Sequence, residues 1–192
     1  SKAPVMLDGK DVMPAVIEIW RRIEALCNKW VGVTDVIHIG IGGSDFGPRL
    51  AIEALAHVPG ITSRGMRMHF LANIDTAELA RILARAQAHS TRVIVVSKSF
   101  TTLETSMNAK AVVAWLKDSG CSTSQITDSL YAVTANIPAA KGPWRNYLMA
   151  STYGWRDVAQ PTNWPIASSL WAESVATWVN TRERRWVRVR AP

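Results

Sequence analysis

The chain has 192 residues, of which 48% are hydrophobic and 19% charged, a composition that predicts one globular domain with a hydrophobic core. It contains no run of eighteen apolar residues and its first four residues lack an apolar signal core, which argues against membrane insertion and secretion and favours the cytoplasm. The net charge is +7, but residues 142–192 contribute +4 of it, so we do not expect nucleic acid to be a partner of the remainder.

The first element expected is an amphipathic helix over residues 14–30, with Pro14 at its start. Its apolar side chains recur at steps of four and three, as on one face of a helix. They are Val16, Trp20, Ile23, Cys27 and Trp30. We expect this helix to cover one face of a sheet.

Residues 36–48 read Val-Ile-His-Ile-Gly-Ile-Gly-Gly-Ser-Asp-Phe-Gly-Pro, a buried strand that runs into a glycine-rich turn. We expect Pro48 to start a helix that continues over residues 49–56, because proline suits the first helical position. Free N–H groups of the turn and of the helix start then favour an anion. The glycines alone are equally compatible with a turn that binds nothing.

Three further strands are predicted at residues 66–72, 92–96 and 129–134. Between them lie helices at 76–86, capped by Asp75 with Glu78, and at 103–117. This alternation predicts an α/β fold, a doubly wound parallel sheet sandwiched by helices, with ligands bound beyond the carboxyl ends of the strands.

The loop at residues 97–102 reads Ser-Lys-Ser-Phe-Thr-Thr and follows the third predicted strand. Thr101 and Glu104 have the spacing of a capping box at the start of the next helix. The other hydroxyls and the ammonium of Lys98 are the usual parts of a phosphate cradle, although a solvated Ser/Thr loop is the alternative.

Residues 39–48 and 97–105, with Asn108 following, resemble the two sugar-phosphate segments of the glucose-6-phosphate isomerase family. Residues 7–14 resemble a stretch that precedes them there. The resemblance covers about residues 5–141 and implies a sugar-isomerase (SIS) domain over residues 1–141, incomplete at its N-terminus.

The resemblance implies reversible isomerisation of glucose 6-phosphate and fructose 6-phosphate, in glycolysis and gluconeogenesis, by a homodimer without metal or organic cofactor. A carboxylate base moves a proton between C1 and C2 through an enediol that an arginine stabilises. Gly43 and Ser44 match residues that contact the sugar near its reacting end. The segment that holds the phosphate matches Ser97, Lys98, Ser99, Phe100, Thr101 and Thr102, with Ser99 where the family usually has threonine.

The catalytic residues of the family lie C-terminal to the matched region: the base glutamate, the ring-opening histidine and lysine, and the arginine of a Gly-Gly-Arg motif. No Gly-Gly-Arg occurs in this sequence. We therefore expect phosphate binding without proton transfer, and a non-catalytic sugar-phosphate-binding module is the alternative function. We interpret none of the four histidines as catalytic: His38 and His69 are expected to be hydrogen-bonded strand residues, and His57 and His89 helix-end or loop residues.

Residues 142–192 hold six of the nine tryptophans and seven arginines, without strand–helix alternation. One interpretation is an irregular tail that stacks on nucleic acid or binds an acidic partner. The other, which we favour, is translation out of frame after Lys141, because the consistency between local pattern and fold ends there. The segments that form the family's dimer interface are mostly missing from the match, which leaves dimerisation of this chain open.

Overall fold

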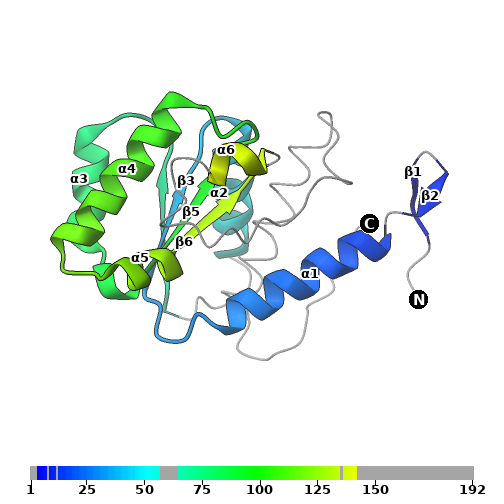
Figure 1. Ribbon diagram of the computed structural model, residues 1–192, viewed down its shortest axis with the longest axis horizontal. Coiled ribbons are helices and arrows are strands. Elements are labelled where there is room, and N and C mark those ends of the chain that lie inside the picture. Colours follow the sequence, from blue (N-terminus) through cyan, green and yellow to red (C-terminus); the bar gives the residue numbers. More distant parts are fainter. Residues whose placement is uncertain (1–3, 8, 12, 57–64, 135, 142–192) are drawn as a thin grey trace.

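The computed structural model describes residues 4–7, 9–11, 13–56, 65–134 and 136–141, so the predictions for His57 and for residues 142–192 lie outside the described residues. Its elements, in chain order, are β1 (Met6–Leu7), β2 (Lys10–Asp11), α1 (Met13–Asn28), β3 (Asp35–Ile39), α2 (Gly43–Ala56), β4 (Arg67–Leu71), α3 (Thr76–Arg85), a 3-10 helix (Ala88–Ser90), β5 (Thr91–Val96), α4 (Leu103–Asp118), α5 (Thr123–Ser129), β6 (Leu130–Val133) and α6 (Ile137–Lys141) (Figure 1). None of the helices in this part of the chain is long and apolar enough to cross a membrane.

The centre of the fold is a four-stranded sheet with the order β4-β3-β5-β6, in which every pair of neighbours is parallel. All five residues of β3 and all four of β6 are buried, as expected of strands covered on both faces. The predicted α/β sandwich is therefore confirmed, and the strand boundaries differ from the expected ones by no more than one residue.

The two faces of the sheet have separate hydrophobic cores. On one face the side chains of Ile23, Cys27 and Trp30, from α1 and the residues after it, pack against β3, β5 and β6. On the other face α3, α4 and α5 pack against the alternate residues of the same strands, and Figure 1 shows these three helices together on one side of the sheet. The predicted apolar stripe thus has the expected role in its C-terminal part, whereas Val16 and Trp20 are only half-buried and do not belong to this core. Trp30 is a packing residue whose indole N–H donates to the Tyr131 hydroxyl.

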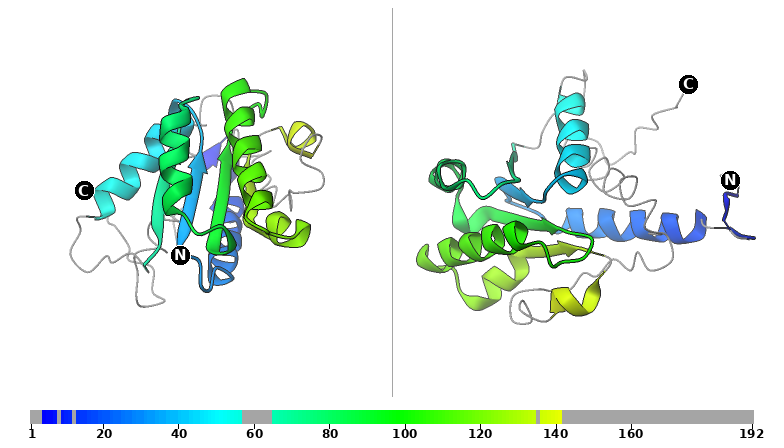
Figure 2. Two further views of the ribbon diagram at one scale, coloured as in Figure 1. Left: turned by 90° about the vertical axis from the view of Figure 1, so that its left-hand side faces the viewer. Right: turned by 90° about the horizontal axis from the view of Figure 1, so that it is seen from above.

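The N-terminal half of α1 and the β1–β2 hairpin extend away from the sheet (Figures 1 and 2). The hairpin pairs Met6 with Asp11 and Leu7 with Lys10, and Gly9 supplies the positive φ of its turn. Neither this hairpin nor the short helix α5 was predicted, although Ser122 and Gln125 form a complete capping box at the start of α5.

Chain topology places two loops side by side at the carboxyl edge of the sheet. From β3 the chain turns into α2 and continues to the outer strand β4, whereas from the neighbouring β5 it turns into α4 and continues towards β6 on the other side. The start of α2 contacts His38 on the α1 face, and α4 packs on the opposite face. The loops after β3 and β5 therefore diverge at the switch point of the sheet, where α/β folds bind ligands.

At the opposite edge, Asp35 is a fully buried carboxylate at the start of β3. Arg67 donates to it through two nitrogens, each at 2.9 Å, and His69 Nε2 lies 2.8 Å from it. Burial alone would raise the Asp35 pKa, but hydrogen bonds from Arg67, His69, the Thr34 hydroxyl and the Gln87 N–H outweigh burial and lower this pKa to about 2. The cluster links β3 and β4 far from the switch point.

Candidate functional site

The loop after β3 enters α2 earlier than the sequence predicts. Gly42 adopts a φ of +58°, and its carbonyl accepts hydrogen bonds from the N–H groups of Asp45 and Phe46 at 2.9 and 2.8 Å. The helix therefore begins at Gly43, and the expectation that Pro48 starts it is wrong, because Pro48 lies within the helix. Gly42 and Gly43 allow the tight turn, and the helix therefore starts at residue 43, five residues before Pro48.

The loop after β5 folds around its own hydroxyl groups. Ser97 Oγ accepts from the Phe100 N–H at 3.1 Å and lies 3.4 Å from Thr102 Oγ1. Ser99 Oγ accepts from the N–H and from the hydroxyl of Thr101, at 3.3 and 2.8 Å. These bonds hold residues 97–102 in a compact turn.

Phe100 anchors this turn to the core. Its φ is +57°, a backbone conformation that residues other than glycine rarely adopt, and its side chain packs against the hydrophobic cluster on the α4 face. Packing of the ring compensates for the backbone strain and fixes the direction in which the loop leaves β5.

The predicted capping box of Thr101 with Glu104 is absent. The N-cap of α4 is Thr102, whose side chain makes no capping hydrogen bond, and the Thr101 hydroxyl donates to Ser99 instead. By contrast, Asp75 caps α3 and Ser122 caps α5 with their side chains. Because Thr102 does not cap α4, the first N–H groups of this 16-residue helix are available to an acceptor from outside it.

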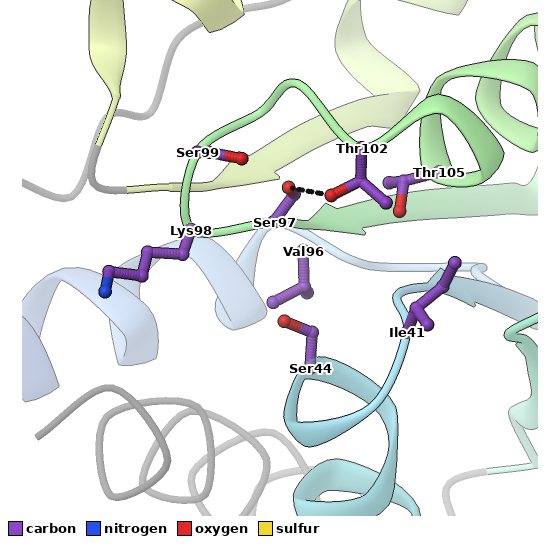
Figure 3. Close-up of a pocket in the computed structure, with 8 residues that line it drawn as sticks. All are labelled: Ile41, Ser44, Val96, Ser97, Lys98, Ser99, Thr102 and Thr105. Carbon is purple, nitrogen blue, oxygen red and sulfur yellow. Dashed lines mark hydrogen bonds between the residues drawn. The ribbon is translucent and has the colours of Figure 1, made fainter. Parts of the chain in front are cut away.

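A pocket of about 200 Å³ lies between the two loops (Figure 3). Its lining residues are Ile41, Ser44, Val96, Ser97, Lys98, Ser99, Thr102 and Thr105. Three residues selected from the sequence do not line the pocket: Gly43, at the start of α2, and Phe100 and Thr101, in the loop after β5.

The lining also includes residues that the sequence analysis did not select: Ile41, Val96 and Thr105. Ile41 is an apolar residue of the loop after β3, and Val96 is the last residue of β5. Thr105 is 4% exposed and follows Thr102 by three residues, a spacing that brings both to one face of α4. This spacing was the signal by which Thr105 could have been found.

The chemistry of the lining favours an anion that accepts several hydrogen bonds. It consists of five hydroxyl groups, one ammonium and two aliphatic side chains, with no carboxylate and no imidazole among the described residues that line the pocket. Lys98 is exposed, and Figure 3 shows its ammonium directed away from the hydroxyl groups. The described residues also contain no group of three His, Cys, Asp or Glu side chains placed to hold a metal ion.

Three of the four histidines are described, and none of these three lines the pocket. His38 binds the Ser44 carbonyl, His69 binds Asp35, and His89 Nδ1 lies 3.5 Å from Cys121 Sγ. The thiols of Cys27 and Cys121 are both buried and form no disulfide, and burial raises the pKa of the Cys121 thiol.

Comparison with known proteins identifies the family. The model of the phosphoglucose isomerase family matches residues 1–142. The chain is 41% identical over 147 residues to a glucose-6-phosphate isomerase of Cupriavidus metallidurans, a match that covers 71% of this chain and 27% of the relative. It is 39% identical over 142 residues to a glucose-6-phosphate isomerase of Legionella pneumophila, and that match covers 69% of this chain and 27% of the relative. It therefore spans about a quarter of the length of the curated relatives it matches.

Solved structures share the fold. A glucose-6-phosphate isomerase from Chlamydia trachomatis superposes with a TM-score of 0.67 at 22% identity, over 93% of this chain and 34% of that one. A hypothetical protein from Thermus thermophilus gives 0.63 at 23% identity, over 86% and 38%. These two likenesses show the shared fold, and the match of the family model to residues 1–142 shows that the chain belongs to the phosphoglucose isomerase family.

Proposed function

We propose that residues 1–141 form the sugar-phosphate-binding part of a glucose-6-phosphate isomerase, and that the pocket at the switch point takes the phosphate of a hexose 6-phosphate. The observation that carries this proposal is the meeting of two features in one place: a cluster of five hydroxyl groups and the start of α4, which Thr102 leaves without a side-chain cap. Hydroxyl groups and helix N-termini are both donors to phosphate oxygens.

The two loops have different roles in this proposal. Ser97, Ser99 and Thr102 donate to the phosphate from the loop after β5, with Lys98 contributing positive charge and the backbone of Phe100 and Thr101 shaping the turn. Gly43 and Ser44 contact the sugar from the start of α2. The pocket volume of about 200 Å³ is below the range of roughly 300–1,000 Å³ for sites that enclose a whole ligand, so it suits the phosphate and the adjoining part of the sugar.

The family reaction is aldose–ketose isomerisation between glucose 6-phosphate and fructose 6-phosphate, which requires a base to move a proton between C1 and C2. We infer that the chain of 192 residues binds the sugar phosphate without isomerising it. Two observations support this inference: the described lining of the pocket contains no carboxylate, and the sequence contains no Gly-Gly-Arg.

A non-catalytic sugar-phosphate-binding module shares this binding mode, and turnover separates it from an isomerase domain. The homodimer and the cytoplasmic setting implied by the family are likewise proposals for this chain. An interaction function for residues 142–192 falls outside the described residues.

Calorimetric titration of the full chain tests the proposal. We expect fructose 6-phosphate to bind, fructose to show no measurable binding, and the double variant S97A/T102A to bind at least about tenfold more weakly, because it loses two hydroxyl donors. The matched control is S124A, an exposed serine at the start of α5 near the opposite edge of the sheet, which should bind like the parent. Equal affinity for fructose and its phosphate would refute the proposal.

Turnover is measured on the same protein by coupling glucose 6-phosphate formation to a dehydrogenase. We expect binding of fructose 6-phosphate without conversion. Conversion that co-purifies with the chain and is lost in S97A/T102A would show that the chain carries its own base, and would overturn the inference on turnover while leaving the binding site in place.

A further inference from the structure

His38 connects the buried strand β3 to the first turn of α2. It is 2% exposed, and its Nε2 lies 2.8 Å from the carbonyl oxygen of Ser44. A carbonyl oxygen only accepts hydrogen bonds, so the proton of this bond is on His38 Nε2. Burial lowers the His38 pKa, although the Ser44 carbonyl and Asp45 oppose this, and the ring is therefore neutral with its proton on Nε2.

Pro48 removes the regular helical donor to the Ser44 carbonyl. In a regular α-helix the carbonyl of residue 44 accepts from the N–H of residue 48, and proline has no N–H. Pro48 is buried inside α2 and leaves this bond unmade. The His38 ring, from β3, donates to this carbonyl, to which Pro48 cannot donate.

The same turn carries one wall of the pocket. Ser44 lines the pocket, and Figure 3 shows it reaching from α2 towards the loop at residues 97–102. Gly40 allows this turn to lie directly against the end of β3. The Phe70 ring packs on the His38 ring with centroids 5.3 Å apart, which limits the orientation of the imidazole.

We propose that His38 is a positioning residue for the sugar-phosphate site: its Nε2–H holds the Ser44 carbonyl in place of the missing Pro48 N–H, and so sets the distance between Ser44 and the loop at residues 97–102. The ligand in this proposal rests on the proposed function, whereas the hydrogen bond does not. A histidine that only fills the core would make no difference to ligand affinity beyond its effect on folding.

The proposal makes a prediction that depends on the absence of an N–H group on Pro48. Replacing His38 by leucine removes the donor at similar bulk, and the further change Pro48→Ala gives the Ser44 carbonyl a donor within its own helix. We expect H38L to weaken fructose 6-phosphate binding about five- to tenfold, H38L/P48A to recover most of that loss, and H38Q, which keeps an N–H donor, to stay within about threefold of the parent. H69L is the matched control, because it removes a histidine from the adjacent strand whose ring contacts Asp35, at the far end of β3 from the pocket, and should not change affinity.

The affinities of these variants decide the proposal. Parent-like affinity in folded H38L, or a loss of affinity that P48A does not repair, overturns the proposal while leaving the proposed function intact. Failure of the parent to bind fructose 6-phosphate refutes the proposed function instead.

Nitrogen-15 NMR of the His38 ring in the parent chain tests the hydrogen bond without ligand and without a variant. A neutral ring with a slowly exchanging Nε2–H supports the proposal, and a proton on Nδ1 overturns it.

Discussion

A side chain at Gly40 would collide with the backbone of Ser44: a Cβ placed on Gly40 would lie 2.7 Å from the Ser44 carbonyl oxygen and 3.1 Å from the carbonyl carbon. The strand end and the first turn of α2 are therefore in direct backbone contact, and the site depends on it. We expect G40A to destabilise the fold by about 1–3 kcal/mol through overpacking and to weaken fructose 6-phosphate binding. Denaturant unfolding and calorimetry measure the two effects.

Gly43 provides the control for this prediction. A Cβ on Gly43 would meet nothing within 4 Å, so G43A should leave the free energy of unfolding within about 0.5 kcal/mol of the parent. Equal stability of G40A and G43A would contradict the close approach of Gly40 to Ser44.

At position 100, replacement by glycine should leave the protein more stable than replacement by alanine, the reverse of the usual order. Both F100A and F100G lose the packing of the ring, but only glycine adopts a φ of +57° without steric cost. We expect F100G to be more stable than F100A by about 1 kcal/mol, opposite to the usual order in regular structure, with thermal unfolding as the measurement. A more stable F100A would mean that the loop does not hold this conformation.

The prediction for Thr105 concerns the affinity for fructose 6-phosphate rather than the stability of the fold. Its hydroxyl lines the pocket from the first turn of α4, so T105V should weaken fructose 6-phosphate binding by about three- to tenfold at nearly unchanged volume. The neighbouring S106A is the control, because Ser106 is not among the lining residues. Similar affinities for both variants would remove Thr105 from the site.

The low pKa of Asp35 predicts how the free energy of unfolding changes in acid. Its folded pKa of about 2 is below the ordinary value of 3.8, so between about pH 4 and 2 the unfolded chain binds a proton that the folded chain does not. The contribution of Asp35 is complete above about pH 4 and falls by about 2 kcal/mol as the pH drops to about 2. Chemical unfolding at several pH values measures it.

D35N should lower stability at neutral pH and flatten this acid dependence, whereas D118N, a change at the exposed end of α4, should keep the parent's profile. An unchanged slope in D35N would place the acid sensitivity elsewhere.

Much of the fold was predictable because the buried strands and the helices between them have strong apolar patterns. Asp75 was recognised as a cap because its spacing to Glu78 is local, and the structure confirms it. Pro48 was misassigned because the turn at Gly42 starts the helix at Gly43. His38, from the preceding strand, donates to the Ser44 carbonyl, to which proline cannot donate, and no local pattern reveals this contact.

The loop at residues 97–102 shows the same limit. The sequence indicated its hydroxyls and their place after a strand, but not which hydroxyl partners which. Thr101 matched the spacing of a capping box and instead donates to Ser99, because Phe100 turns the chain with a positive φ between them. The buried Asp35 was not singled out either, since its partners Arg67 and His69 come from another strand.

Amide NMR of the labelled chain during titration with fructose 6-phosphate tests the central claim most directly, because it reports binding and location together. The account predicts that the largest shifts fall on Ser44 and on residues 97–105, that inorganic phosphate shifts the second group alone, and that fructose shifts neither. Shifts confined to other parts of the chain, or an identical response to fructose and its phosphate, would contradict the account.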